Sequence, residues 1–366
     1  MKLKEKISWL MGRLQRQLFP CLEECYVSPL TEQEKHLVKI LELIKVESHT
    51  AIGRQWMGRP PAERKAIARC FVAKAVLRYQ HTRSLIHELQ ARPNLRRICG
   101  FVKQRDIPSE STFSRAFAEF AGSNLGTVVN DALVEEYWSE ELVGHISRDS
   151  TAIQGREKAA KKVKQAKAPG KRGRPAKGEE RAPAELKRLD IQLQQTADEA
   201  ILNLPKVCDR GTKKNAKGYK ESWTGYKLHV DVNDAGFPLS AVLTSASLHD
   251  SQVAIPLMKL TSDKVQYCYD LMDAAYDAEQ IWNQSRELDH VPIIDRNPRN
   301  GKVVPMAPHE ARRYNERSTV ERFNSRLKEE FGGRNVMVRG AGKVMLHLMF
   351  GVVSLFADLL IKLESC

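Results

Sequence analysis

The sequence predicts an α/β fold, in which a mixed-sheet domain is preceded by an all-helical N-terminal domain. Residues 32–143 carry apolar side chains at the three- and four-residue spacing of buried helices. After residue 226, short alternating segments typical of strands are interleaved with helical ones, which indicates a mixed sheet covered by helices. We therefore divide the chain into a helical domain, 1–140, and an α/β domain, 141–366.

Five helices are predicted in the helical domain. The first has apolar residues at helical spacing within residues 37–44. The second opens at Pro60 and the fourth at Pro108, because proline is favoured in the first turn of a helix. The third and fifth cover residues 82–89 and 125–138. A bundle of this kind at the front of a basic chain suits either a helix-turn-helix reader of DNA or an assembly module, and no recognition helix stands out.

The α/β domain opens with an alternating segment, residues 143–153, which predicts a strand with Asp149 near its end. Two further segments, residues 226–232 and 237–244, flank a polar turn that ends at Gly236. A turn of this composition between two strand-like segments predicts a β-hairpin.

Another predicted strand, residues 264–271, leads to Asp273. The remaining predicted elements are a short buried strand at 291–295 and helices at 278–286, 314–330 and 343–363. The last helix includes a stretch without formal charge, residues 344–357. This stretch is too short to cross a bilayer, so we expect a buried helix and no membrane partner.

The net charge of +14 favours a polyanionic partner, most simply nucleic acid. Residues 151–190 hold 13 basic and 5 acidic side chains, so +8 of this charge lies in one segment. Seven cysteines are scattered and form no Cys-x-x-Cys pair, which argues against a zinc site and favours a reducing cytosol. The N-terminus lacks the apolar stretch of a signal peptide, so we expect a cytoplasmic protein.

The basic segment has no apolar period and predicts a disordered insertion at about residues 154–190 within the α/β domain. It contains Lys-Arg-Gly-Arg-Pro, with Arg172 and Arg174 on either side of a glycine. This thin, extended motif resembles an AT-hook, which lays arginines in the narrow minor groove of A·T-rich DNA. A generic basic linker is the alternative interpretation.

A four-residue motif near the C-terminus is the most informative feature of the chain. Tyr314, Arg317, Glu321 and Lys328 lie at offsets of zero, three, seven and fourteen residues. On one continuous helix these positions fall within an arc of roughly 60°. The stripe would carry a phenol, a guanidinium, a carboxylate and an ammonium group, which suits a metal-bound phosphate with its oxygens clamped from both sides.

Three carboxylates are the candidate catalytic groups and metal ligands: Asp149 and Asp273 after strands and Glu321 on the charged helix. Phosphodiester cleavage needs a nucleophilic water, a leaving oxygen and neutralisation of charge, and two divalent ions held by carboxylates supply all three. Each acid also has a simpler interpretation. Either aspartate could cap a turn or a helix, and Glu321 could form a surface ion pair with Arg317.

The spacing of these residues resembles that of a known family. Tyr314, Arg317, Glu321 and Lys328 match the Tyr-(2)-Arg-(3)-Glu-(6)-Lys motif of DDE transposases from bacterial insertion sequences. This spaced motif is fairly specific.

Other segments resemble the same family over roughly residues 140–360. Asp273-Ala-Ala-Tyr-Asp is similar to the block around the family's second aspartate, and Asp149-Ser-Thr to the block around the first. Trp223-Thr-Gly-Tyr-Lys-Leu-His and Ser247-Leu-His-Asp-Ser are similar to its strand segments.

The resemblance implies a ribonuclease H-like fold in which Asp149, Asp273 and Glu321 hold two Mg²⁺ or Mn²⁺ ions. It implies hydrolysis of double-stranded DNA at the terminal inverted repeats of an insertion sequence. The freed 3′-hydroxyl ends would then be joined to target DNA.

The resemblance also implies partners for the remaining residues of the motif. Arg317 and Lys328 would bind DNA phosphates near the cut, with Tyr314 beside them. Asp277 and Lys227 are candidates for supporting contacts. Synapsis of two element ends implies a homodimer on DNA, in the bacterial cytoplasm and its nucleoid.

The chain departs from the family pattern between Asp273 and Glu321, which only 47 residues separate. The large strand-rich insertion that some members carry there is missing or much reduced. A hairpin-stabilising tryptophan on that insertion has no counterpart here, and Trp282 is not assigned its role. Two alternatives to an active transposase stay open: a non-catalytic DNA-binding repressor derived from one, and a structure-specific nuclease on the same fold.

Overall fold

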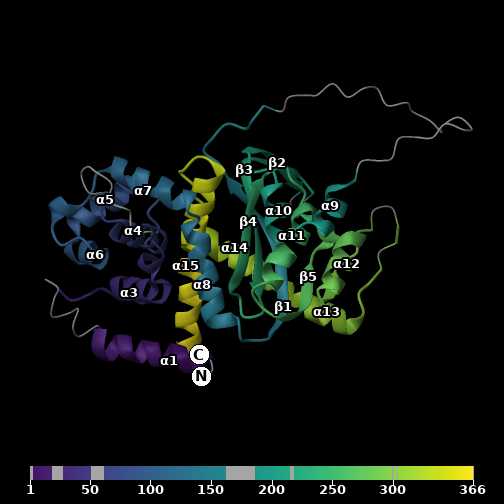
Figure 1. Ribbon diagram of the computed structural model, residues 1–366, viewed down its shortest axis with the longest axis horizontal. Coiled ribbons are helices and arrows are strands. Elements are labelled where there is room, and N and C mark those ends of the chain that lie inside the picture. Colours follow the sequence, from purple (N-terminus) through teal and green to yellow (C-terminus); the bar gives the residue numbers. More distant parts are fainter. Residues whose placement is uncertain are drawn as a thin grey trace, which may run out of the picture.

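The computed structural model describes residues 3–18, 28–50, 62–161, 186–214, 218–298, 301–302 and 304–365. Figure 1 shows a helical region on one side and a sheet with its covering helices on the other. The C-terminal helix α15 (Ala341–Ser365) stands between the two. The mixed α/β arrangement with a helical N-terminal region agrees with the predicted fold class.

The helical region contains α-helices and short helical turns. These are α1 (Leu3–Arg13), η1 (Leu14–Leu18), α3 (Glu32–Ile44), η2 (Val46–His49), α4 (Arg64–Val76), α5 (Thr82–Ala91), α6 (Pro93–Ile98), η3 (Gln104–Asp106), α7 (Glu110–Gly122) and α8 (Leu125–Trp138). All five predicted helices are present. The start proposed for the second, Pro60, lies outside the described residues.

The sequence explains where two of these helices begin. At α3, the Thr31 side chain accepts a hydrogen bond from the Glu34 N–H at 3.3 Å, and Glu34 Oε2 accepts one from the Thr31 N–H at 2.9 Å. This capping box satisfies N–H groups that the first turn leaves free. The sequence analysis predicted no helix at α6, which begins with Pro93. That omission was wrong because proline starts a helix as readily as it ends one.

Helix α15 belongs to the core of the helical region. Phe350 of α15 packs against Phe71 of α4, with ring centroids 5.7 Å apart, and Phe71 packs against Phe117 of α7 at 4.7 Å. By length and composition residues 341–363 could cross a membrane, but 78% of the apolar window is buried inside the protein. The predicted buried helix is therefore confirmed.

The sheet is mixed. Its strands are β1 (Val143–Gln154), β2 (Asp209–Lys214), β3 (Lys220–Asn233), β4 (Pro238–Ser245), β5 (Tyr267–Met272) and β6 (Val291–Ile294). The order is β2-β3-β1-β5-β6, and β4 also pairs with β3. β3 is antiparallel to β1, β2 and β4, whereas β1, β5 and β6 run parallel. The predicted hairpin is formed by β3 and β4, where Gly236 adopts a φ of +89°.

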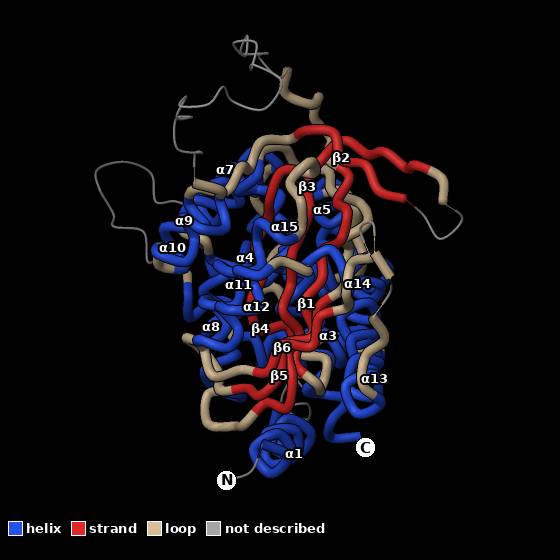
Figure 2. The backbone as a smooth tube through the Cα atoms, turned by 90° about the vertical axis from the view of Figure 1, so that its right-hand side faces the viewer, coloured by secondary structure: helices blue, strands red, loops and turns tan. Residues whose placement is uncertain are grey.

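Helices cover both faces of the sheet (Figure 2). They are α9 (Arg188–Gln194), α10 (Ala197–Leu202), α11 (Ser251–Ser262), α12 (Glu279–Glu287), α13 (Pro308–Tyr314) and α14 (Ser318–Glu330), with 3-10 turns η4 (Ala274–Tyr276) and η5 (Asn315–Arg317). On one face, Val230 of β3 lies in the same apolar cluster as Phe323 of α14. On the other, Met272 of β5 lies in a cluster with Met258 of α11.

Two predictions about local structure were wrong in ways that affect the site. Residues 314–330 do not form one helix, because the 3-10 turn η5 separates α13 from α14. Asp149 does not lie near a strand end, since β1 continues for five residues to Gln154. The sequence analysis also missed β2, α9, α10 and α11, the last of which contains Pro256.

Candidate active site

The register of the sheet brings Asp149 and Asp273 together. β1 and β5 are parallel, with Ser147 opposite Leu271. Asp149 and Asp273 lie two residues further along these neighbouring strands. Because side chains alternate along a strand, both point to the same face of the sheet. Asp149 is also opposite Val230 of β3, whose side chain lies on the face covered by α14. Both aspartates thus point toward the layer that contains α14.

Glu321 lies in the first turn of α14 and is connected to the two aspartates through Arg317. The Arg317 guanidinium donates to Glu321 Oε1 at 2.5 Å and lies 5.8 Å from the centroid of the Tyr314 ring. Burial opposes the charge of Arg317, but Tyr314, Asp149, Glu321 and Asp273 together raise its pKa. Arg317 is therefore the cation that interacts with all three acids.

The negative charge of Asp149 and Asp273 is only partly neutralised by nearby cations. Burial raises the pKa of Asp149 to about 7, and the charges of Asp273 and Asp250 act in the same direction. Burial also raises the pKa of Asp273, with further contributions from Asp250 and Asp295. Arg317 offsets only part of this effect. A cation placed between these carboxyl groups would therefore stabilise their ionised form.

Hard oxygen donors with excess negative charge suit Mg²⁺ or Mn²⁺. Within the described ranges, however, no group of three or more His, Cys, Asp and Glu side chains is arranged to hold a metal ion. Glu321 is instead paired with Arg317, and its side chain is 56% exposed. Asp273 accepts a hydrogen bond from the Ala275 N–H at 2.9 Å, so the capping interpretation also holds. The donor set fits a divalent ion, whereas the closed cage expected from the sequence is not formed.

Asp250 is a fourth acid in this cluster that the sequence analysis did not identify. Lys227 Nζ donates to Asp250 Oδ1 at 2.8 Å and to the Leu248 carbonyl at 2.9 Å. Although burial alone would raise the pKa of Asp250, His229 and Lys227 lower it overall. Lys227, expected to make supporting contacts, therefore acts on Asp250. The only signal for Asp250 in the sequence was its place in the Ser-Leu-His-Asp-Ser segment.

Tyr276 places a phenol beside the same acids. The residue is 1% exposed, and its hydroxyl has no hydrogen-bond partner in the described part of the chain. Burial raises the pKa of Tyr276 well above its usual value, and Asp250, Asp149 and Asp273 raise it further. The hydroxyl therefore stays protonated, so that it can donate a hydrogen bond to a ligand oxygen at this site.

A buried ionic network lies on the opposite face of β1. Arg148, next to Asp149, donates to Asp231 Oδ2 at 2.6 Å and to Asp270 Oδ1 at 3.2 Å. Thr261 and Ser285 donate to the same two aspartates at 2.7 Å each. Since neighbouring residues of a strand point to opposite faces, this network holds β1 against β3 and β5 while leaving Asp149 free for the site.

Lys328 extends the positive charge of α14 beyond Arg317. Burial lowers the pKa of Lys328, as do Lys213 and Arg334, while Asp149 acts in the opposite direction. The ammonium group thus lies near both Asp149 and two other cations. The remaining predicted DNA contacts, Arg172 and Arg174, lie outside the described residues.

Asp277, the other candidate for supporting contacts, binds residues of α12 and of the segment after β6. Its Oδ1 accepts hydrogen bonds from Trp282 Nε1 at 3.0 Å and Arg296 Nη1 at 3.3 Å. Its Oδ2 accepts one from the Asn297 N–H at 3.1 Å. Asp277 therefore anchors the segment after β6 to α12, and Trp282 belongs to that contact.

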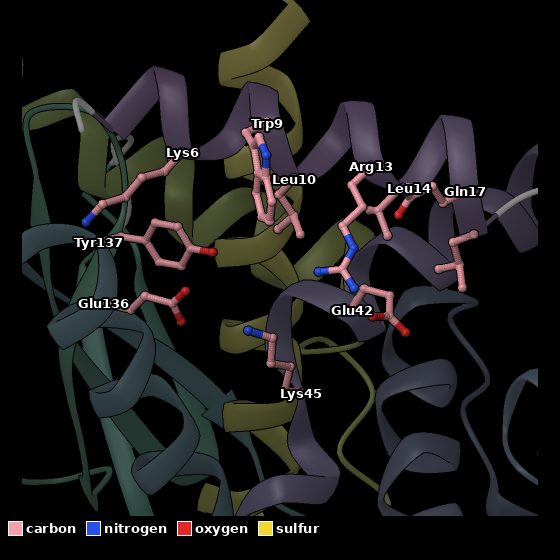
Figure 3. Close-up of a pocket in the computed structure, with 11 residues that line it drawn as sticks. Lys6, Trp9, Leu10, Arg13, Leu14, Gln17, Glu42, Lys45, Glu136 and Tyr137 are labelled. Atoms are coloured by element: carbon pink, nitrogen blue, oxygen red, sulfur yellow. The ribbon is translucent and has the colours of Figure 1, made fainter.

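A separate pocket of about 460 Å³ lies between α1, α3 and α8 (Figure 3). Its lining mixes the cations Lys6, Arg13 and Lys45 with the acids Glu42 and Glu136. No residue of the acidic cluster lines it, so this pocket belongs to the helical region and not to the candidate active site.

Comparisons with known families agree with the two regions of the fold. Residues 201–356 match the family model described as "Transposase DDE domain". Residues 27–119, which cover α3 to most of α7, match that described as "Transposase domain (DUF772)". The first match includes Asp273 and Glu321 but begins after Asp149. No curated protein and no solved structure matches the chain at a significant level.

Proposed function

We propose that this chain, whose two transposase domains indicate a transposase, cuts DNA at the ends of an insertion sequence and joins the ends to target DNA. Asp149, Asp273 and Glu321 form the catalytic centre, on a sheet of ribonuclease H-like topology. The observation that supports this proposal is the parallel register of β1 and β5, in which Ser147 lies opposite Leu271, two residues before Asp149 and Asp273.

The proposed reaction consists of two phosphoryl transfers. In the first, a water oxygen attacks phosphorus at the element end, the P–O3′ bond breaks, and a 3′-hydroxyl is released. In the second, that 3′-oxygen attacks a target phosphorus and displaces a target 3′-oxygen. Each transfer forms one P–O bond and breaks one. The developing charge lies on the phosphate oxygens, so catalysis depends on fixed positive charge and orientation.

The residues have distinct roles in this proposal. Two Mg²⁺ or Mn²⁺ ions, when bound, would neutralise charge and activate the attacking water. Asp149, Asp273 and Glu321 would hold them. Arg317 would bind the scissile phosphate, with Tyr314 beside it. Support comes from the raised pKa values of both aspartates, since a bound cation would relieve that repulsion.

Double-stranded DNA is the proposed partner, as terminal inverted repeats and as target. The net charge of +14 supports a polyanionic partner. Lys328 on α14 and the basic segment with Arg172 and Arg174 would bind phosphates and the minor groove. The helical domain, 1–140, contributes DNA binding or assembly, and two copies act together in the bacterial cytoplasm because two ends must be cut.

Incubating the full chain with Mg²⁺ and a duplex carrying the inverted repeats that flank the coding sequence tests this function. Cleavage at the repeats together with joined product is expected. Cleavage without joining would favour a structure-specific nuclease. Binding that weakens with salt but gives no cleavage would favour a repressor derived from a transposase.

Alanine substitutions test the three acids. Asp149→Ala, Asp273→Ala and Glu321→Ala should each lower the cleavage rate by at least about a thousandfold. Each variant removes a ligand of the metal ions whose positive charge would stabilise the transition state. DNA affinity should persist. Asp263→Ala, which removes an exposed acid at the end of α11, serves as the control and should cut normally. Near-normal cutting by any of the three variants would remove that acid from the centre.

A further inference from the structure

A second pocket, between the helical region and the start of α15, contains a buried lysine without a counter-ion. Lys74 of α4 is 8% exposed and lines a cavity of about 390 Å³. No side-chain hydrogen bond or ion pair engages it within the described ranges. Burial lowers the pKa of Lys74 to about 8, so the ammonium form still predominates at pH 7. An unpaired ammonium in an apolar setting destabilises the fold, which makes an anionic ligand the natural complement.

The rim of the pocket adds positive charge. Arg156, Arg339 and Lys343 line it, and none forms an ion pair within the part of the chain that the structure describes. The acid on the rim, Glu110, already accepts hydrogen bonds from Arg83 at 3.1 Å. Four cations therefore line the cavity, while its acid, Glu110, is paired with Arg83.

The other walls strengthen this preference. Phe71 and Phe117 form an apolar wall, and replacing water by apolar side chains lowers the local dielectric constant, which strengthens electrostatic attraction within the cavity. His347 also lines it, but burial and Lys74 lower the pKa of His347 to about 3, so the ring is neutral at pH 7. Its Nε2 is 3.1 Å from the Gly332 carbonyl, which assigns the proton to that nitrogen. The site is thus selective for anions without depending on histidine protonation.

The pocket lies within reach of a duplex bound at the acids. Arg156 follows Asp149 by seven residues along β1 and the segment after it, at most roughly 23 Å at an extended rise. One strand of DNA carries a phosphate about every 3.4 Å, so this span covers at most about seven phosphates. The Gly340 N–H donates to Glu157 Oε1 at 3.0 Å and holds the Arg339 segment beside Arg156. Lys328, near Asp149, supplies a cation closer to the acids.

We propose that this pocket binds a backbone phosphate of the DNA duplex, within about seven nucleotides of the bond to be cut, with Lys74 as its buried contact. This inference rests on the proposed function, because the position of the cut is taken to be at Asp149, Asp273 and Glu321. A phosphodiester is a single permanent anion of the right size for four converging cations. Free orthophosphate shares this chemistry. The further cation Lys328, which lies closer to the acids, favours DNA as the ligand.

Lys74→Met tests the pocket, with Lys65→Met as its matched control. Both variants remove one charge from α4, but Lys65 is exposed and outside the cavity. For a labelled duplex of mixed sequence, Lys74→Met should weaken binding about tenfold and reduce the slope of log affinity against log salt by about 0.9. Lys65→Met should stay within about twofold of the wild type. Without DNA, Lys74→Met should melt at the same temperature as the wild type or higher, which excludes misfolding as the cause.

Unchanged DNA affinity in Lys74→Met would overturn the proposal, as would an equal loss in Lys65→Met. If orthophosphate raises the melting temperature of the wild type but not of Lys74→Met while DNA affinity is unchanged, the ligand is a free anion and the proposal is wrong. A wild-type protein that binds DNA through Lys74 but never cuts would contradict the proposed function and leave this pocket standing.

Discussion

At the scale of a single residue, Asp149 shows how burial and neighbouring charge act on the site. The pKa of Asp149 is about 7 in the folded protein, whereas an ordinary aspartate in an unfolded chain has a pKa near 3.9. Between these two pH values the folded protein keeps a proton on Asp149 that the unfolded chain releases. Asp149 is only half-buried, yet it lies beside Asp273 and Asp250. This arrangement is unfavourable for the fold alone and becomes favourable when a cation binds.

The raised pKa predicts how stability depends on pH without divalent ions. Between about pH 4 and 7 the native state binds more protons at Asp149 than the unfolded state, so stability falls as pH rises through this window. Urea unfolding of Asp149→Asn should show a pH dependence smaller by on the order of 3 kcal/mol between pH 4 and 8. Asp263→Asn, an exposed acid, should keep the wild-type dependence. Identical curves for wild type and Asp149→Asn would show that Asp149 titrates normally.

Sequence reasoning predicted candidate site residues but missed Asp250 and Tyr276, which lie beside them. Arg317 and Glu321 were recognisable because their spacing is local. Asp250 and Tyr276 were not, because their roles depend on where α11 and η4 pack against the sheet. Spacing along a chain carries little information about such contacts, which form between elements distant in sequence.

At the scale of an element, β1 serves two purposes through its alternation. Asp149 points toward α14, and its neighbour Arg148 points into the network with Asp231 and Asp270. The strand pattern and its approximate limits could be predicted from residues 143–153. Its parallel register with β5 could not, since register is set by pairing between distant segments.

The network predicts a large stability effect that is separate from catalysis. Arg148→Met leaves two buried carboxylates without their cation, so the free energy of unfolding should fall by about 3–5 kcal/mol. Chemical denaturation measures this change. Arg83→Met, which breaks an exposed pair with Glu110, should cost no more than about 1 kcal/mol. A loss for Arg148→Met as small as that for Arg83→Met would mean that the network does not hold β1 in place.

The charged helix shows the limit of periodicity arguments. Residues 314–330 have a helical pattern, and both ends of the segment are helical. The 3-10 turn at Asn315–Arg317 changes the angle between Tyr314 and Glu321, so the four residues do not form the expected straight stripe. Arg317 nevertheless contacts Glu321, because the interruption ends just before α14.

At the scale of the whole molecule, α15 connects the helical region to the α/β region. Its residues enter the apolar core of the helices through Phe350 and the core beneath α14 through Leu348. The pocket with Lys74 lies where these regions meet. The sequence predicted a mixed α/β region and a helical one, yet it gave no sign that the last helix would complete the core of the first region.

The central claim is that Asp149, Asp273 and Glu321 form one cation site. Calorimetric titration of the full chain with Mn²⁺ at pH 8 tests it directly, because Asp149 is then ionised. We expect wild-type protein to bind, and Asp149→Asn, Asp273→Asn and Glu321→Gln each to bind at least about tenfold more weakly, a loss of about 1.4 kcal/mol. Asp263→Asn should bind as wild type does. Wild-type affinity in any of the three variants, or no binding by the wild type, would contradict the account.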